Sequence, residues 1–575
     1  MRALELTQQF SASISESKPV LTLRQVRIPV WAQAALIFAG ALITMMTLIF
    51  ASPYVVSLDS FFHTRIASEF WRQGTLNLDF PWLPYTIANA ANFVDNHLLF
   101  HLYLAPFSYY FGDNGVRVAV AVVAAANVLM TWFLLCGIGV RYPLLWTIAF
   151  FGLSLPFLFR MLMIRVNGAS VLCLLITLHL LLQKRYRWLI PMGFIFVWLY
   201  FGFIIIIAFA ALYTFSLYIA EKRFEWRPIA YVCIGVALGI FINPYFPKNL
   251  DWIADLLITR VDRETPLGAE WRAPTTEALL YNSPGALFAL FFAFLRPTFG
   301  GGKRDTVENT LMFTALMTLG MVFTAVRFLE YFPVFALLFC AAAWGRVPID
   351  SLFNPRFERL NELARRFAWV PLLVIVGVFT VRNVPFTYSL VARNDDGHRL
   401  FGAADWLEVN APAGSMIFST GFNDFAYLFY HNPQHIYAIG LDPTYLSFES
   451  PELWDLYYSI IQGNEGEDSG RLIFERFHAD FVISDKPRDG AFHEFAVSDP
   501  YLDLVYQDAR EVVWRVIDVE AEAAAENEPT GEELFSGGSG QAAEGAEQSQ
   551  SDAEARGEGV PSNADNVDSN GDQSE

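Results

Sequence analysis

Long apolar runs, separated by short polar or basic segments, dominate the first 391 residues of the chain. A run of about 20 apolar residues is long enough for a helix to cross a bilayer. The pattern predicts eleven such helices, near residues 29–51, 116–137, 142–159, 166–183, a tight pair within 188–220, 228–246, 283–298, 306–326, 328–345 and 368–391. We therefore expect an α-helical polytopic membrane protein.

The lysines and arginines of short loops set the orientation, because such loops stay in the cytoplasm. The stretch 97–112 is apolar but short and contains Pro106, so it is either a span or a helix lying in the interface. As an interfacial helix it leaves all the basic segments on one side: the N-terminus, KRYR (184–187), EKRFEWR (221–227), GGGKRD (300–305) and 346–367. We expect a multi-pass protein of the plasma (inner) membrane with its N-terminus in the cytoplasm and its C-terminal domain outside.

Beyond the helical body, the pattern changes. DWLEVNAPAGSMIFST (405–420) is typical of a helix, a turn and a strand, and FHADFVISD (477–485) of a buried strand. The last residues are rich in Ala, Glu, Ser and Gly and cannot bury enough apolar surface to fold. The predicted regions are a cytoplasmic segment (1–28), a helical body (29–391) with external loops at 52–115 and 247–282, an extracytoplasmic α/β domain (392–518) and a disordered acidic tail (519–575).

Composition supports this division. Charged residues make up 17% of the chain, whereas a soluble protein carries about 25%. Fifteen acids and one arginine follow residue 518, so the tail carries −14 of the net charge of −19 and the body only about −5. The acidic balance therefore gives no argument for a nucleic-acid partner, and we expect none. The cysteines all lie in apolar runs, which favours core residues over disulfides or metal ligands: Cys136, Cys173, Cys233 and Cys340.

The first candidate site is SLDSFFHTR (57–65), directly after the first apolar run. Asp59 can remove a proton or bind a cation, and His63 lies one helical turn beyond it. Arg65 adds a positive charge suited to a phosphate or pyrophosphate. A single such residue is explained as a polar loop position, but a carboxylate, an imidazole and a guanidinium within seven residues favour a functional site.

An Asp, an aromatic pair, a His and an Arg just after the first span resemble the first external loop of GT-C glycosyltransferases, most closely the DxYYHxR-type motifs of oligosaccharyltransferase catalytic subunits. Residues 93–123 resemble the interfacial helix and second span of that superfamily. The resemblance implies a membrane-embedded transferase that uses a sugar linked to polyprenyl phosphate or pyrophosphate. It also implies that Asp59 is the catalytic carboxylate and, if a divalent cation (Mg or Mn) takes part, its ligand.

Two oligosaccharyltransferase motifs are missing from the sequence. The next external loop, which carries a second acidic motif in that family, reads RMLMIRVNG (160–168) and has no carboxylate. The nearest counterpart of the family's WWD-type acceptor motif is GFNDFAYL (421–428), which lacks the tryptophans. The sequence therefore supports GT-C chemistry better than protein N-glycosylation.

Glu270, in GAEWRAP (268–274), is the best candidate for a second catalytic acid, because the neighbouring Trp271 and Pro274 indicate a shaped loop. The alternative is a solvated loop charge. Asp95, His97 and His101 can bind a cation or a diphosphate from the interfacial helix. Such helices also carry polar residues for hydration alone.

Four further charged residues, Arg160, Arg165, Arg327 and Glu330, lie at the ends of predicted spans on the same side as Asp59. Long basic side chains at helix ends commonly reach toward lipid headgroups. We expect Arg165 and Arg327 to contribute to a clamp for the lipid phosphate.

The predicted function is transfer of a sugar from a polyprenyl carrier to a lipid, glycan or protein acceptor on the extracytoplasmic face. Asp59, His63 and Glu270 are the predicted catalytic residues, and the predicted substrate-binding residues are Arg65, Asp95, His97, His101, Arg165 and Arg327. The alternative is a non-enzymatic membrane protein for lipid or polysaccharide transport or assembly. A transporter carries polar residues or broken helices near the bilayer midplane, whereas the apolar runs here are nearly free of charge.

Overall fold

The computed structural model describes residues 26–257, 269–296, 303–347, 366–394 and 399–519, with 22–23 and 362 in addition. The described residues leave out most of the predicted cytoplasmic segment, most of the basic connector 346–367 and all of the predicted tail after its first residue.

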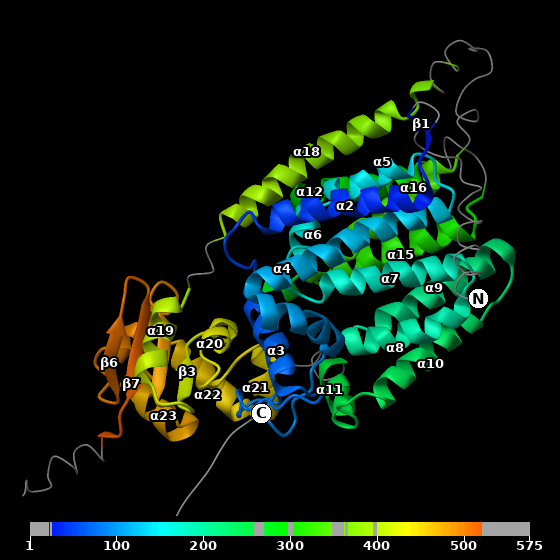
Figure 1. Cartoon of the computed structure of the whole chain (residues 1–575). Coiled ribbons are helices and arrows are strands. Elements are labelled where there is room, and N and C mark those ends of the chain that lie inside the picture. Colours follow the sequence, from blue (N-terminus) through cyan, green and yellow to red (C-terminus); the bar gives the residue numbers. More distant parts are fainter. Residues whose placement is uncertain are drawn as a thin grey trace, which may run out of the picture. The chain divides into compact units, whose positions relative to one another are not determined.

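Apolar helices form the larger part of the structure, and they coincide with the apolar runs of the sequence (Figure 1). They are those of a multi-pass membrane protein. Their bounds are α2 (Val30–Ile49), α4 (Leu98–Gly137), α7 (Asn167–Leu182), α8 (Leu189–Leu199), α9 (Ile204–Glu221), α10 (Arg227–Phe241), α13 (Pro284–Phe294), α15 (Thr306–Val322), α16 (Phe332–Gly345) and α18 (Val370–Ala392).

The expectation of eleven full spans is not met. Among the described residues, four helices are long and apolar enough to cross a membrane (α2, α4, α9 and α18), or five if α12 (Thr276–Asn282) and α13, bent by 90°, are taken as one. Five further apolar stretches have only 10–17 residues.

The predicted span 142–159 is one clear correction, because this run is divided into α5 (Pro143–Ile148), η1 (Ala149–Gly152) and α6 (Leu155–Arg160). Ser154 has extended backbone angles and accepts a hydrogen bond from the Phe157 amide, so it ends one helix and caps the next. Hydropathy alone does not detect such a cap.

The interfacial helix predicted for 97–112 is the first part of α4. Gly112 has φ 55° and ψ −142°, which breaks the helix between this part and the apolar part that follows. Only glycine readily adopts this conformation. The following Gly115 is equally constrained, because a Cβ there would lie 2.2 Å from the Phe107 carbonyl oxygen.

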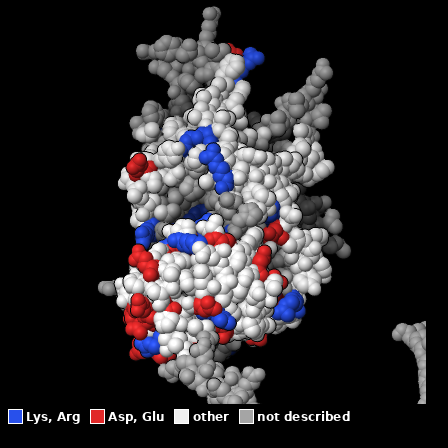
Figure 2. Space-filling model, turned by 90° about the vertical axis from the view of Figure 1, so that its left-hand side faces the viewer, with Lys and Arg blue, Asp and Glu red and all other residues white. Residues whose placement is uncertain are grey.

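The surface also differs between the apolar helices and the rest of the structure. Apolar residues on α18 face outward, among them Val378 and Val381, which are 62% and 73% exposed. In Figure 2 charged side chains gather over the lower half of the visible face, and few lie over the upper half. An exposed apolar surface of this kind fits contact with lipid acyl chains.

The C-terminal domain contains a five-stranded sheet of order β4-β3-β5-β7-β6, in which β3 pairs in parallel with β4 and β5, and β7 pairs antiparallel with β5 and β6. The predicted strands at 405–420 and 477–485 are both present, as β3 and β5. The strands are β3 (Met416–Ser419), β4 (Ile436–Tyr437), β5 (Phe481–Asp485), β6 (Leu502–Gln507) and β7 (Glu511–Val516), and the helices are α19 (Phe401–Asn410), α20 (Phe425–His431), α21 (Pro443–Glu449), α22 (Pro451–Ile461), α23 (Ser469–Phe477) and α24 (Gly490–Ala496).

Helix α3 (Asp59–Gln73) joins this domain to the helical body. The ring of Phe61 is buried, with its centroid 4.6 Å from that of Tyr427 and 5.3 Å from that of Tyr430, both on α20. The Tyr430 hydroxyl donates to Asp113 at 2.7 Å, next to the break in α4. The start of α3 is therefore held between the two parts of the structure.

Phe61→Ala should lower the melting temperature of the purified protein, because it empties a buried aromatic contact between α3 and α20. Truncation of a buried Phe costs about 3 kcal/mol or more. Val409→Ala on α19 is a matched control at a side chain that is 82% exposed, where the expected change stays within about 0.5 kcal/mol. The measurement is thermal unfolding in detergent followed by tryptophan fluorescence. Equal melting temperatures of Phe61→Ala and the wild type would contradict this packing role.

Candidate functional site

A cavity of about 490 Å³ lies at the start of α3. It is lined by segments that are far apart in the sequence. Its charged and polar lining residues include all the predicted site residues except Arg65 and His101. The residues that concern the chemistry are Asp59, His63, Asp95, Asn96, His97, Arg165, Asn167, Tyr200, Glu270, Trp271, Arg327, Asn423 and Asp442.

The centre of the site is an ion triad of Asp59, Arg165 and Glu270. Arg165 forms an ion pair with Asp59 Oδ2 through Nη2. The same guanidinium holds Glu270 with two hydrogen bonds, Nη1 to Oε2 at 2.9 Å and Nη2 to Oε1 at 3.2 Å. The structure therefore brings together two predicted catalytic acids and one predicted binding arginine.

A second layer of charge supports Glu270. Arg160 Nη2 lies 3.4 Å from Glu270 Oε2, and Arg160 Nη1 lies 3.7 Å from Glu330 Oε2. The Arg327 guanidinium lies over the Trp271 ring, 4.1 Å from its centroid. These contacts attach the 269–271 segment to α6 and to η5 (Val326–Glu330), so Glu270 has a fixed position.

The arginines keep Glu270 ionised. Burial would raise the pKa of the Glu270 carboxyl, but the charge and hydrogen bonds of Arg165, with Arg327 and Arg160, outweigh burial and lower it to about 2. Glu270 is therefore a poor proton donor at neutral pH, and its carboxylate acts mainly on Arg165.

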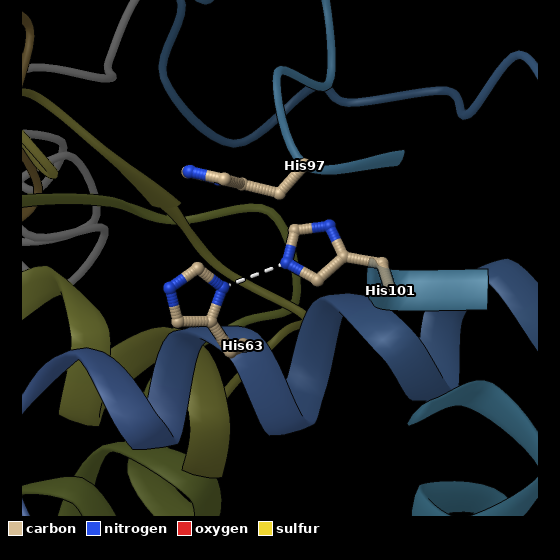
Figure 3. A group of neighbouring side chains, drawn as sticks. All are labelled: His63, His97 and His101. Atoms are coloured by element: carbon tan, nitrogen blue, oxygen red, sulfur yellow. Dashed lines mark hydrogen bonds between the residues drawn. The ribbon is translucent and has the colours of Figure 1, made fainter. Parts of the chain in front are cut away.

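Three histidines form a second cluster (Figure 3), and two of them, His63 and His97, line the cavity. His63 Nδ1 lies 2.7 Å from His101 Nε2, and His101 Nδ1 lies 2.6 Å from Asp95 Oδ2. Asp95 Oδ1 also accepts the backbone N–H of His97 at 2.9 Å. Burial, and then the neighbouring histidines, lower the pKa of His63 well below its usual value. Burial likewise lowers the pKa of His97 to about 3.

Arg65 lies apart from this arrangement and does not line the cavity. Its guanidinium forms an ion pair with Glu69 at 2.9 Å, one turn along α3, and Glu69 also binds Arg72. The structure therefore gives Arg65 a partner on another face of α3. His101 does not line the cavity either, but it contacts His63, which does.

The surroundings of Asp59 do not fit Mg²⁺ or Mn²⁺. These ions need several oxygen ligands in a near-octahedral arrangement. Here the positive charge between Asp59 and Glu270 is the Arg165 guanidinium, and a cation at that point would have to displace it.

Other lining residues were not predicted. Tyr200 lies in the connection between α8 and α9, and Asn423 and Asp442 belong to the C-terminal domain. Asn423 lies in the segment 421–428, which is the nearest counterpart of the WWD-type acceptor motif in the sequence. That likeness was the sequence feature that could have pointed to Asn423. Asp442 accepts hydrogen bonds from Thr444 and caps α21, so its type and position also have a structural reason.

No protein-family model matches the sequence, and no curated protein matches it by sequence. Solved structures do match. The oligosaccharyltransferase of Archaeoglobus fulgidus in the apo form has a TM-score of 0.55 at 12% identity, over 81% of this chain and 71% of that one. The same enzyme, AglB, in complex with an inhibitory peptide and a dolichol-phosphate gives 0.54 at 13%, over 81% and 71%. ArnT from Cupriavidus metallidurans bound to undecaprenyl phosphate gives 0.51 at 14%, over 85% and 99%.

The TM-scores show that these structures share the fold of this chain, and sequence identities this low show nothing more specific. The resemblance seen in the first external loop is thereby confirmed at that level: the chain has the fold of the GT-C glycosyltransferases.

Proposed function

We propose that this protein is an integral membrane glycosyltransferase that moves a sugar from a polyprenyl-phosphate or polyprenyl-pyrophosphate carrier to an acceptor. The observation that carries the proposal is the meeting of one carboxylate, Asp59, with two guanidinium groups, Arg165 and Arg327, in one cavity. A phosphate-linked donor needs positive charge around its leaving group and a base beside the acceptor.

The choice of donor is supported by charge and by the relatives in fold. Arginine binds phosphate through its planar fork of N–H donors, and Arg165 and Arg327 both line the cavity. Two proteins with this fold, AglB and ArnT, were solved with dolichol-phosphate and undecaprenyl phosphate, respectively. We carry over the class of ligand, a polyprenyl phosphate, and leave the sugar open.

In the proposed reaction the bond between sugar C1 and the phosphate oxygen breaks, and the electron pair leaves with the carrier phosphate. An acceptor oxygen or nitrogen forms the new bond to C1 and gives its proton to Asp59. Arg165 contacts Asp59 through Oδ2, so Oδ1 is the oxygen that receives the proton. Arg165 and Arg327 stabilise the charge that develops on the departing phosphate.

The acceptor side of the cavity is assigned to the C-terminal domain. Asn423, Asp442 and Tyr445 line the cavity from that domain and offer amide, carboxylate and hydroxyl groups for a polar acceptor. We propose that the acceptor is a lipid, a glycan or a protein presented on the extracytoplasmic face. Because the WWD-type tryptophans are missing, the proposal does not include a protein sequon.

The experiment that tests this function is reconstitution of the purified full-length protein with a synthetic polyprenyl-phosphate sugar and cell-envelope acceptors. Asp59→Asn should reduce transfer by about 10²–10⁴-fold, the usual contribution of a positioned general base. The amide keeps an oxygen for Arg165, so donor binding should persist. Transfer is measured by appearance of free carrier phosphate and of labelled acceptor.

Asp79→Asn is the matched control, because Asp79 is exposed in the same external segment and does not line the cavity. It should transfer at the wild-type rate. Wild-type transfer by a folded Asp59→Asn protein would end the catalytic proposal and favour the transport or assembly alternative. Loss in both variants would point to damage of the external segment.

We assign Glu270 a positioning role, in which it holds Arg165 against Asp59. Because its folded pKa, about 2, lies below the ordinary 4.5, the unfolded chain takes up the proton first as the pH falls. The stabilisation by ionised Glu270 is therefore fully present above about pH 5 and is lost as the pH falls toward 2.

Glu270→Gln should accordingly melt at a lower temperature than the wild type at pH 7, with the difference shrinking between pH 5 and pH 3. Glu277→Gln, at an exposed position on α12, is the control and should show little difference at any pH. Melting curves of detergent-solubilised protein across this range provide the measurement. A Glu270→Gln difference that stays constant or grows toward pH 3 would contradict the assigned ion pair.

A further inference from the structure

The cluster of His63, His97 and His101 has no task in the reaction proposed above. Each imidazole offers one nitrogen, and these nitrogens all lie within 4.8 Å of one another. The rings come from α3 and from the start of α4, and they point toward one another in Figure 3. Metal-binding sites commonly have such convergence of three imidazoles.

Asp95 arranges these rings as an outer-shell carboxylate does. Since Asp95 is the acceptor, His101 Nδ1 carries the proton of their 2.6 Å contact, so His101 Nε2 accepts the hydrogen bond from His63 Nδ1 and offers the lone pair that a metal would take. A carboxylate behind a histidine fixes the tautomer and increases the basicity of the ligating nitrogen. Asp95 is itself fixed by the His97 backbone N–H.

His97 is held by a different contact. Its ring stacks on Tyr200, with centroids 5.8 Å apart and planes inclined by 9°. Both His97 and His63 line the cavity, whereas His101 lies behind them, 1% exposed. An ion among the three nitrogens would therefore have protein on one side and the cavity on the other.

We propose that His63, His97 and His101 bind a single Zn²⁺ ion, with Asp95 orienting His101 and with a fourth coordination position open to the cavity. Three imidazoles suit zinc and other late transition metals, whereas Mg²⁺ and Mn²⁺ prefer oxygen. This site is separate from Asp59, whose surroundings do not fit a hard cation.

The change needed to admit the ion is small. Zn–N bonds of about 2.0–2.1 Å in a tetrahedron place two ligand nitrogens about 3.3 Å apart, and His63 Nδ1 and His101 Nε2 are now 2.7 Å apart. When zinc binds at His63 Nδ1, the proton of that nitrogen is lost and His63 takes up a proton on Nε2, so the ring stays neutral as its other tautomer.

The open position would bind a phosphate oxygen, because His63 and His97 line the same cavity as Arg165 and Arg327. This part rests on the proposed function. Zinc binding itself is measured without donor or acceptor, so it can succeed where glycosyl transfer fails, and the reverse.

The experiment uses purified full-length protein in detergent, stripped with a chelator and titrated with ZnCl₂. The expected result is one zinc per chain by elemental analysis and by calorimetry. Cobalt substitution should give the intense visible bands of a four-coordinate site. His97→Ala and His101→Ala should each weaken binding by more than tenfold, and Asp95→Asn, which keeps the shape of the side chain, by about 10–100-fold.

His493→Gln is the matched control, since His493 lies on α24 and does not line the cavity. It should bind zinc as the wild type does. Absence of zinc from the wild-type protein, or equal zinc in the control and in His97→Ala, would overturn the proposal. If a histidine variant fails to fold, the comparison of Asp95→Asn with wild type, checked by melting temperature, still decides the question.

Discussion

The ion pairs of Arg165 are the interaction on which the site depends. One guanidinium binds Asp59 at the start of α3 and Glu270 in the segment before α12, so three segments far apart in the chain meet at one charge. Partly buried charges are costly unless they are paired, and each of these three would be unfavourable alone. The geometry of the cavity therefore depends on a single arginine.

The same interaction explains a departure from the oligosaccharyltransferase pattern. The segment RMLMIRVNG (160–168), where the resemblance led us to expect a second acidic motif, has no carboxylate and contains Arg165. Three carboxylates in one place repel one another and need a cation between them. Here two carboxylates, Asp59 and Glu270, meet, and Arg165 supplies the positive charge. The position of Arg165 beside Asp59 therefore accounts for the poor fit of Mg²⁺ there. The histidine cluster, with its nitrogen donors, is a separate arrangement on another wall.

Sequence reasoning predicted the elements better than it predicted the directions of side chains. Apolar runs located α2, α7 and α18 closely, because burial in lipid or protein leaves a continuous signal. Arg65, which was predicted together with Asp59 and His63, does not line the cavity with them. Arg65 is two residues beyond His63, about 200° around the helix, so a helix that aims His63 into the cavity turns Arg65 away. Helical spacing alone could have separated them.

The contacts that complete the cavity could not be predicted from local pattern. Arg165 and Glu270 are separated by 105 positions, and Asn423 comes from another domain. Pairing at such separations is decided by packing, which a single sequence does not encode in any window. Only the residue types, acids and arginines in segments between apolar runs, were suggestive.

The distribution of buried polar groups bears on the choice between transfer and transport. Inside the helices these groups serve packing: Asn127 of α4 donates to the Gly168 carbonyl of α7 at 2.8 Å, and Ser170 bonds Tyr331 at 2.9 Å. Such bonds join neighbouring helices. The ions Asp59, Arg165, Glu270 and Arg327 instead gather around one cavity that also touches the C-terminal domain. A path for a solute requires polar groups along the depth of the membrane, whereas a reaction on a lipid-linked donor requires them together at one level. The clustering of these ions around one cavity supports the proposed transfer over transport.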